Sequence, residues 1–205
     1  NINQSDIKSV VKVLKSKFIT QGPKIEEFEK KVAAKVNSNY SVAVNSASSA
    51  LHLACIALGV GPGDWVWTST NTFVASANCA IHCGAKIDFI DIDPQTFNIS
   101  IKHLSDKLEK SKRLNRIPKV LIPVHFAGQP CNMPAIYKLS KKYGFKIIED
   151  ASHAIGARYN NIKVGSCKHS EITIFSFHPV KIITSGEGGM ILTNDEDLAK
   201  KFNSA

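Results

Sequence analysis

The sequence predicts an α/β protein whose mostly parallel sheet is covered by helices on both faces. Three observations lead to this fold class. Short Val- and Ile-rich runs alternate with amphipathic stretches over most of the 205 residues, the runs are apolar at consecutive positions, and no repeat or low-complexity linker interrupts them. Strands that are apolar on both sides must be covered on both sides. We therefore expect one large domain over residues 1–205.

The first part of the chain predicts two helices, a strand and a third helix. Apolar residues recur at helical spacing over 5–16 and 24–36, so both segments are expected to be amphipathic helices. The apolar run "SVAV" at 41–44 predicts a strand. Small and polar residues then lead into a helix over about 48–58, with a serine available to cap its first turn.

From residue 65 to residue 150, strands and helices alternate. Apolar runs predict strands over 65–69, 85–92, 118–126 and 145–150. Helical periodicity between them predicts helices over 72–83, 101–110 and 133–144. Parallel strands need crossover connections of this kind, so the alternation favours parallel neighbours.

After Asp150 the regular alternation of strands and helices ends. The runs 171–177 and 189–194 are closely spaced and predict two further strands, and a helix is expected to begin near Asp195. The chain stops at Ala205, inside or just after that helix. Because an enzyme rarely ends so abruptly, we expect that a carboxy-terminal portion is missing.

The composition excludes several classes of protein. With 43% hydrophobic and 21% charged residues, the chain has the balance of a soluble globular protein, and no apolar run approaches the roughly 20 residues of a membrane span. The formal net charge of +9 suggests nucleic-acid binding, but the lysines are dispersed among Glu and Asp and accompany no such motif. We expect a solvated basic surface, with no nucleic-acid or membrane partner.

Cysteine usage indicates a reducing compartment. The five cysteines are odd in number and scattered, with no CxxC pair. The cluster "CAIHC" at 79–83 could hold a metal ion or lie on a packed helix, and the second is favoured because no other pair of ligands accompanies it. Nothing at the amino terminus resembles a signal peptide. We therefore expect a cytoplasmic protein without a metal site.

The stretch "VAVNSASSALHLA" passes from a strand into a helix through small or polar residues, 45–49. Free backbone N–H groups and the helix dipole at such a point can bind a phosphate group. An ordinary serine cap has the same appearance, and both readings stay open. The stretch lacks the Walker and dinucleotide glycine patterns, which argues against those nucleotide folds.

A second candidate is "IIEDASHA", in which a strand ends in Glu149 and Asp150 and His153 follows. Successive strand residues point to opposite faces, so only one of the two carboxylates is expected to face a site. Asp150 precedes the small Ala151 and Ser152, which would let a flat ligand approach. The carboxylate could bind a metal ion, cap a turn or pair with a protonated ring nitrogen.

A third candidate is Lys181, a lone lysine in the run "SFHPVKIITSGEGG". Apolar surroundings destabilise an ammonium ion, which lowers its pKa and frees the amine to form a Schiff base. A lysine that covers apolar surface and reaches water is the alternative. Ser176, five residues earlier, could donate to a phosphate, and glycines 186, 188 and 189 permit a tight turn.

Together these parts are what pyridoxal 5′-phosphate (PLP) requires: a phosphate cradle, an aromatic wall, a carboxylate for the pyridine nitrogen and a lysine for the aldehyde. Ordered stretches over nearly the whole chain resemble the DegT/StrS-type sugar-nucleotide aminotransferases, which are PLP enzymes of fold type I. The stretches are "GPKIEEFE", "VAVNSASSALHLA", "TNTFVASANCAI", "DIDPQTFNI", "PVHFAGQPCNM", "IIEDASHAIGA" and "FSFHPVKIITSGEGG".

The resemblance implies a catalytic pair. Lys181 would bond covalently to the cofactor aldehyde and move protons, and Asp150 would keep the pyridine nitrogen protonated. The family's large domain has a mostly parallel, seven-stranded type of sheet, and we expect that the family's carboxy-terminal small domain is missing from these 205 residues. No metal is implied.

The remaining contacts to the cofactor and the substrate also follow from the resemblance. Phe73 would stack on the ring, and the phosphate would be bound by Ala47 and Ser48 with Ser176. His153 occupies a place where many relatives carry Gln near the phenolic oxygen. The segment Lys17, Phe18, Ile19 and Thr20, together with Ala47, would approach the sugar nucleotide.

Within the family, the motifs are most similar to the branch of pseudaminic acid biosynthesis that aminates C4 of a UDP-linked 4-keto-6-deoxy sugar. The implied reaction takes its amino group from L-glutamate in a homodimer and gives a product of the UDP-4-amino-4,6-dideoxy-N-acetyl-altrosamine type, for surface glycans or flagellin. The sugar, the nucleotide and amination at C3 or C4 stay open. So do two rivals: a PLP-dependent sugar dehydratase, which has His in place of Lys181, and a non-catalytic ligand-binding module.

Overall fold

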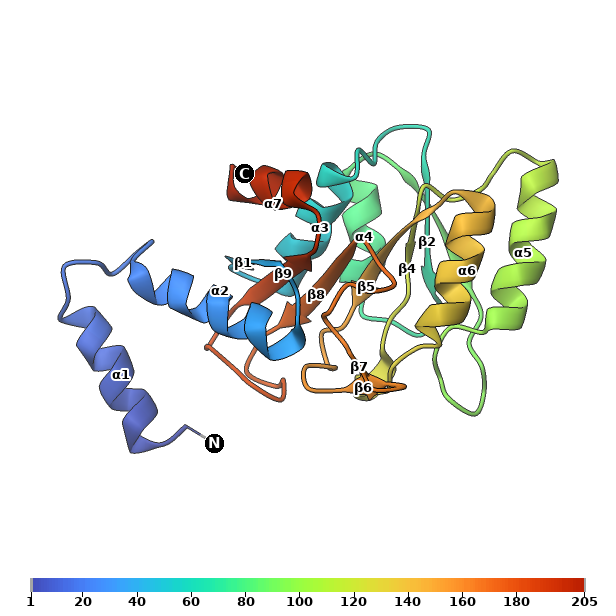
Figure 1. Cartoon of the computed structure of the whole chain (residues 1–205). Coiled ribbons are helices and arrows are strands. Elements are labelled where there is room, and N and C mark those ends of the chain that lie inside the picture. Colours follow the sequence, from blue (N-terminus) through green and yellow to red (C-terminus); the bar gives the residue numbers. More distant parts are fainter. Residues whose placement is uncertain (1, 205) are drawn as a thin grey trace.

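The structure is a computed structural model that describes residues 2–204. Within these residues a seven-stranded sheet forms the centre, in the order β1-β9-β8-β5-β4-β2-β3 (Figure 1). Its strands are β1 (Tyr40–Val44), β2 (Trp65–Ser69), β3 (Lys86–Ile90), β4 (Val120–Ile122), β5 (Lys146–Asp150), β8 (Ile172–Ser176) and β9 (Gly189–Thr193). Only β9 runs antiparallel to its neighbours. The predicted mostly parallel sheet is confirmed.

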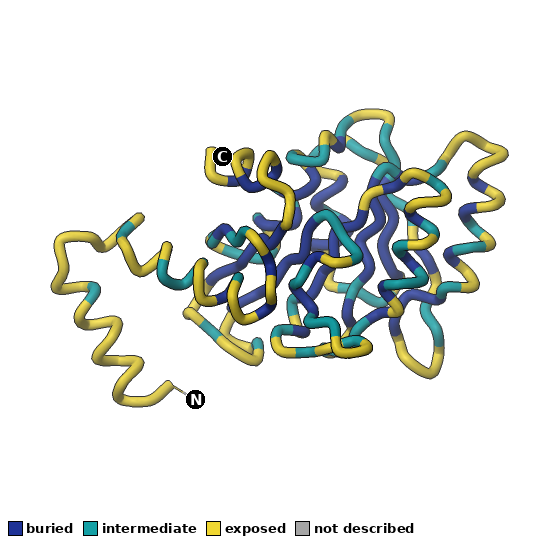
Figure 2. The backbone as a smooth tube through the Cα atoms, viewed as in Figure 1, coloured by how far each residue is buried: buried dark blue, intermediate teal, exposed yellow. Residues whose placement is uncertain are grey.

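Helices cover both faces of the sheet, as expected. The α-helices are α1 (Gln4–Leu14), α2 (Pro23–Val36), α3 (Ala47–Ala57), α4 (Ala75–His82), α5 (Ile101–Arg113), α6 (Met133–Tyr143) and α7 (Glu196–Asn203). Apolar side chains of α3, α4 and α7 pack on one face, and those of α2, α5 and α6 pack on the other. Figure 2 shows the strands buried between these two layers.

The alternation of side chains along each strand builds both halves of the core. On β9, Ile191 packs toward α3 and α7, whereas Met190 and Leu192 pack toward α2. On β5, Ile148 packs on the face covered by α3, whereas Ile147 packs on the other face, toward α5 and α6. Both sets are apolar, which is why these strands read as continuous apolar runs rather than as alternating ones.

Three local differences from the sequence prediction have physical causes. The helix expected over 72–83 begins only at Ala75, and the strand expected over 118–126 ends at Ile122 because Pro123 has no N–H for the ladder. A small hairpin of β6 (Arg158–Tyr159) and β7 (Ile162–Lys163) was not predicted. Its turn residues, Asn160 and Asn161, have φ of 45° and 64°, as a two-residue hairpin turn requires.

Helix α1 projects from the body of the molecule (Figures 1 and 2), and none of its residues is buried. Its first turn is held locally, because the Asn3 side chain accepts hydrogen bonds from the backbone N–H groups of Ser5 and Asp6. Among the described residues, no helix is long and apolar enough to cross a membrane.

The packing of α5 gives a direct test of the fold. Leu104 is 0% exposed, whereas Leu114, at the end of the same helix, is 63% exposed. We expect Leu104→Ala to lower the free energy of unfolding by about 2–5 kcal/mol because it leaves a cavity, and Leu114→Ala to change it by less than about 0.5 kcal/mol. Urea unfolding followed by circular dichroism measures both. Equal effects would contradict the assigned packing.

Candidate active site

A cavity of about 660 Å³ opens at the carboxyl edge of the sheet. Its walls come from the segments that follow five strands, namely 46–51 after β1, 71–75 after β2, 124–127 after β4, 150–153 at the end of β5 and 176–188 after β8. Ligands of open α/β sheets bind at this edge, because the strands end there and the helices begin. This edge is therefore the candidate place for a ligand.

One wall is the amino-terminal end of α3. Ser46 caps the helix by accepting a hydrogen bond from the Ser49 N–H at 3.1 Å. The N–H groups of Ala47 and Ser48, in the first turn, have no acceptor within the helix, and the dipole is positive there. The serine cap and the anion-binding loop, which were alternatives in the sequence, are therefore compatible in the structure.

Strand β9 passes directly beneath this loop. A Cβ atom built on Gly189 would lie 2.5 Å from the carbonyl carbon of Ser46 and 2.7 Å from the backbone nitrogen of Ala47. No real side chain tolerates such distances. The loop can take its position above the sheet only because residue 189 is glycine.

Asp150, at the end of β5, is a second part of the wall and is 4% exposed. Its Oδ2 accepts a hydrogen bond from Ser76 Oγ at 2.6 Å. Its Oδ1 accepts bonds from Ser152 Oγ at 2.7 Å and from Ser152 N at 3.2 Å. A carboxylate accepts bonds through both oxygens in this way, and so its orientation is fixed.

Lys181 lies on the segment after β8 and contacts His153 through its Nζ and the ring Nε2. Burial lowers the pKa of the Lys181 amine below its usual value, although the Asp150 carboxylate opposes part of that effect. The pKa of His153 is lowered as well, by burial and by the nearby Lys181 charge, against the opposing Asp150 charge. The amine is therefore unprotonated more often than that of a surface lysine.

The apolar setting of Lys181 is weaker than the sequence suggests. Its neighbours Val180, Ile182 and Ile183 are all exposed, because no strand forms over this segment. Lys181 itself is half-buried. Phe73 lines the cavity but is 73% exposed, so it stands at the rim rather than as a closed wall.

All the residues predicted to hold the cofactor line this one cavity, namely Ala47, Ser48, Phe73, Asp150, His153, Ser176 and Lys181. The segment Lys17–Thr20 does not line it and is exposed. Sequence reasoning missed Thr72, Ser76 and Ser152, which surround Asp150 or support its partners. It also missed His178 and Glu187 at the rim, whose side chains lie 3.7 Å apart.

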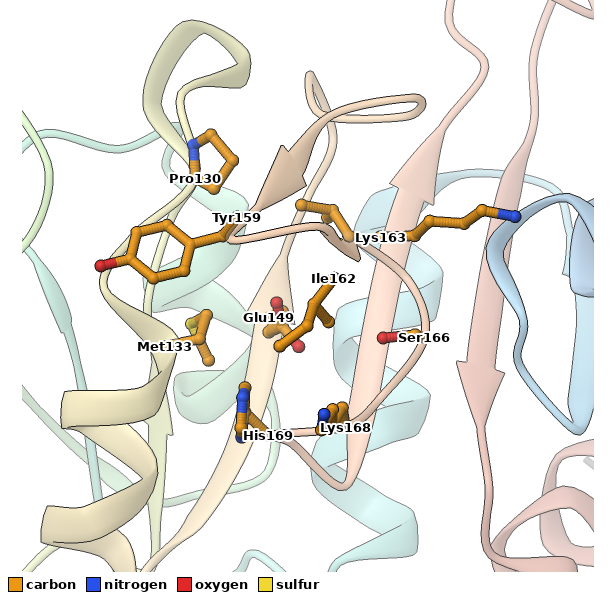
Figure 3. A pocket seen from close by; sticks show the side chains of 10 residues that line it. Pro130, Met133, Glu149, Tyr159, Ile162, Lys163, Ser166, Lys168 and His169 are labelled. Carbon is orange, nitrogen blue, oxygen red and sulfur yellow. The ribbon is translucent and has the colours of Figure 1, made fainter.

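Glu149 points to the other face of the sheet, as the alternation along β5 predicts. It lines a second cavity of about 20 Å³, room for roughly one water molecule. Figure 3 shows Glu149 among the side chains that line this cavity. His125 Nε2 lies 2.8 Å from Glu149 Oε2, and the Cys131 N–H donates to His125 Nδ1 at 3.0 Å. Because Nδ1 accepts, the ring proton is on Nε2 and is donated to the carboxylate.

Two further hydroxyl groups, of Ser170 and Thr173, donate to Oε1 of Glu149. Burial alone raises the pKa of Glu149, but the hydrogen bonds outweigh burial and hold the pKa below its usual value. The carboxylate therefore acts as a structural anchor beneath the site. Across residues 2–204, no group of three or more His, Cys, Asp and Glu side chains is arranged to hold a metal ion.

The fold and the cavity define a class of protein: an α/β domain that brings an amine, a carboxylate and an anion-binding helix end around one cavity. The chain belongs to the DegT/DnrJ/EryC1/StrS aminotransferase family, whose model matches residues 1–204. The match confirms the family to which the sequence motifs point.

Individual relatives agree with the family. A UDP-4-amino-4,6-dideoxy-N-acetyl-beta-L-altrosamine transaminase of Campylobacter jejuni is 45% identical over 203 residues, which are 98% of this chain and 52% of that protein. Helicobacter pylori PseC, an aminotransferase of pseudaminic acid biosynthesis, has a TM-score of 0.90 at 32% identity, covering 99% of this chain and 53% of that one.

A relative from Streptococcus pneumoniae, solved in a PLP form, has a TM-score of 0.87 at 30% identity over 99% of this chain and 55% of that one. The chain spans about half the length of the curated relatives it matches. It therefore corresponds to about half of such a protein.

The anchoring role of Glu149 gives a prediction for acid stability. We expect Glu149→Gln to lower the free energy of unfolding at pH 7 by about 1–3 kcal/mol, because the amide nitrogen of Gln cannot accept the buried hydrogen bonds that a carboxylate oxygen accepts. A carboxylate whose folded pKa is depressed stabilises the fold above its unfolded pKa, and this contribution is lost as the pH falls through the folded value. The variant should therefore begin to approach the parent only below about pH 4.5, the usual value of this carboxyl group, and should match it more closely as the pH falls further through the folded pKa.

Urea unfolding at pH 7, 5.5, 4 and 3 measures this difference. Glu196→Gln is the control, since Glu196 pairs with Lys200 at 2.9 Å on an exposed surface. We expect that change to cost less than about 1 kcal/mol at every pH. A difference between parent and Glu149→Gln that stays constant from pH 7 down to pH 3 would contradict the role assigned to the carboxylate.

Proposed function

We propose that this chain is the cofactor-binding part of a PLP-dependent aminotransferase that transfers an amino group from L-glutamate to C4 of a nucleotide-linked 4-keto-6-deoxy sugar. One observation carries the proposal: Lys181, Asp150 and the end of α3 all line the same 660 Å³ cavity. Family membership and the named activity of the Campylobacter relative support it. The product would be of the UDP-4-amino-4,6-dideoxy-N-acetyl-altrosamine type, used for surface glycans or flagellin.

The residues present fit PLP. The backbone N–H groups of the Ser46–Ser48 loop can donate hydrogen bonds to a phosphate group. Because Gly189 has no side chain, the loop can lie close above β9 with these N–H groups at the cavity. Ser176 is buried at the same cavity and adds a hydroxyl. In the same cavity, the Asp150 carboxylate suits a protonated ring nitrogen, and Phe73 at the rim would cover the ring.

When bound, PLP supplies an aldehyde carbon and an electron-withdrawing ring that stabilises negative charge beside an attached amino group. Lys181 Nζ, whose pKa is lowered by burial, is suited to bond covalently to an aldehyde and, once released, to move a proton at the donor's α-carbon. The negative charge of the Asp150 carboxylate would stabilise the positive charge of a protonated ring nitrogen. His153 orients the amine of Lys181, because its ring nitrogen Nε2 contacts Lys181 Nζ.

A sugar substrate and a second subunit belong to the same proposal. Because Lys17–Thr20 do not line this chain's own cavity, a role for them in sugar binding requires the cavity of a second copy, as in a homodimer. The exposed, basic surface and the nucleotide-sugar substrate fit a cytoplasmic enzyme.

The reaction is tested with the purified gene product, L-glutamate and a small panel of UDP- and dTDP-linked 4-keto and 3-keto sugars. Glutamate-dependent formation of a 4-amino sugar supports the proposal. A 3-amino product would move the site of amination, a deoxygenated product without net amination would favour a dehydratase, and binding without turnover would favour a ligand-binding module.

The role of Lys181 has its own test. Lys181→Ala should abolish the borohydride-fixed bond between PLP and the protein and reduce the rate by about 10²–10⁴-fold, the share that positioned acid–base groups contribute. Mass spectrometry of the reduced complex measures the first effect and product formation the second. Lys200→Ala, on an exposed helix face, is the control. Normal turnover by Lys181→Ala would refute the assignment.

The Gly189 contact predicts a specific loss of affinity. A methyl group at residue 189 overlaps the backbone of Ser46 and Ala47, so Gly189→Ala must displace the loop. If displacing the loop costs about 1–3 kcal/mol of binding free energy, the dissociation constant for PLP rises by roughly 5- to 150-fold. Absorbance titration measures it. At Gly61 a Cβ meets nothing within 4 Å, so Gly61→Ala should bind like the parent; equal binding by both variants would contradict the cradle.

A further inference from the structure

We propose that Ser76 positions the Asp150 carboxylate so that Oδ2, the oxygen Ser76 itself holds, is the one that meets the ring nitrogen of the cofactor. The inference rests on the proposed function and adds a residue to which the sequence analysis gives no role. Its starting point is a contact across 74 residues of sequence, from the first turn of α4 to the end of β5.

The direction of the hydrogen bonds is fixed by what each group can donate. Ser76 is 0% exposed, and its Oγ lies 2.6 Å from Asp150 Oδ2. A carboxylate only accepts, so the serine proton points to Asp150. Thr72 Oγ1 lies 2.9 Å from Ser76 Oγ and donates to it. Thr72, Ser76 and Asp150 thus form a short chain of hydroxyl donors that ends on the carboxylate.

Counting acceptor sites shows which oxygen remains free. An ionised carboxylate has about four lone-pair sites, two on each oxygen. Ser152 fills both sites of Oδ1, with its hydroxyl and its backbone N–H. Ser76 fills one site of Oδ2. The site left over is therefore on Oδ2, next to the Ser76 bond, and Asp150 lines the cavity.

The backbone at Ser76 is held independently of the carboxylate. Its N–H donates to the Phe73 carbonyl at 3.2 Å in the first turn of α4. The cap residue of that helix, Val74, provides no side-chain hydrogen bond, and the single hydroxyl proton of Ser76 goes to Asp150. The positive end of the α4 dipole also faces the carboxylate, which favours a negative charge there.

The test uses PLP with the purified gene product. Ser76→Ala removes the donor at almost constant volume and places a good helix former in α4. We expect the PLP dissociation constant to rise about tenfold, as for loss of a hydrogen bond to a charged group. The visible circular dichroism of bound PLP should fall toward that of the free cofactor, because the ring loses its fixed orientation. In turnover, kcat should fall while the KM for L-glutamate stays near the parent value.

Two further variants separate positioning from packing. Thr72→Val removes the outer donor and should give the same changes to a smaller extent. Ser140→Ala is the matched control: Ser140 is buried on α6, donates only to the Tyr137 carbonyl and does not line the cavity. It should leave PLP affinity and visible dichroism unchanged.

Each outcome decides the matter. If the parent binds PLP and Ser76→Ala matches it in affinity and dichroism, the inference is wrong and the proposed function stands. If Ser76→Ala changes only thermal stability, the hydroxyl has a structural role alone and the inference is likewise wrong. If Ser76→Ala does not fold, unchanged affinity and dichroism in Thr72→Val overturn the inference. If the parent does not bind PLP, the proposed function and the inference fall together.

Discussion

Strand β5 ends in two adjacent carboxylates, Glu149 and Asp150, and both need hydrogen-bond donors because both are buried. This requirement determines which segments meet at the site. Glu149 is 5% exposed and Asp150 is 4% exposed, so neither can rely on water. Burying an unpaired charge costs far more than a hydrogen bond returns, and each group must therefore be met by donors from other segments. Since the two side chains point to opposite faces, the donors must come from both sides of the sheet.

The donors that meet these carboxylates also fix the loops around the cavity. On one face, Ser76 ties the first turn of α4 to Asp150. On the other, His125 joins Glu149 to the segment after β4, which also lines the cavity. Side chains held by buried hydrogen bonds lose little further freedom when a ligand binds. The carboxyl edge is thus rigid where chemistry is proposed, which is what catalysis by preorganised groups requires.

The Lys181 segment contrasts with this rigid wall. Its apolar residues are exposed, and Lys181 is held by its contact with His153 rather than by enclosure in a core. A lysine that must bond, release and move protons needs room for its side chain. Partial burial is sufficient to lower the pKa of the amine and still leaves that room.

Much of the fold was predictable because it rests on local patterns. Consecutive apolar residues identified the buried strands, and helical spacing identified the helices, with errors at ends such as the 72–74 segment before Ala75. The hairpin around Asn160 and Asn161 was missed because its strands have two residues each and bury little. The antiparallel β9 was not specified by the sequence pattern, since a 12-residue connection without a helix permits either direction.

The sequence by itself determined the layered architecture, because periodicity is a property of neighbouring residues, and its motifs supplied candidate groups for a cofactor. Only the tertiary structure decided which donors meet Asp150 and Glu149. Ser76 is 74 residues from Asp150, and His125 is 24 residues from Glu149. Contacts of this kind depend on strand order and helix placement, which result from packing the whole core, and no local propensity encodes them.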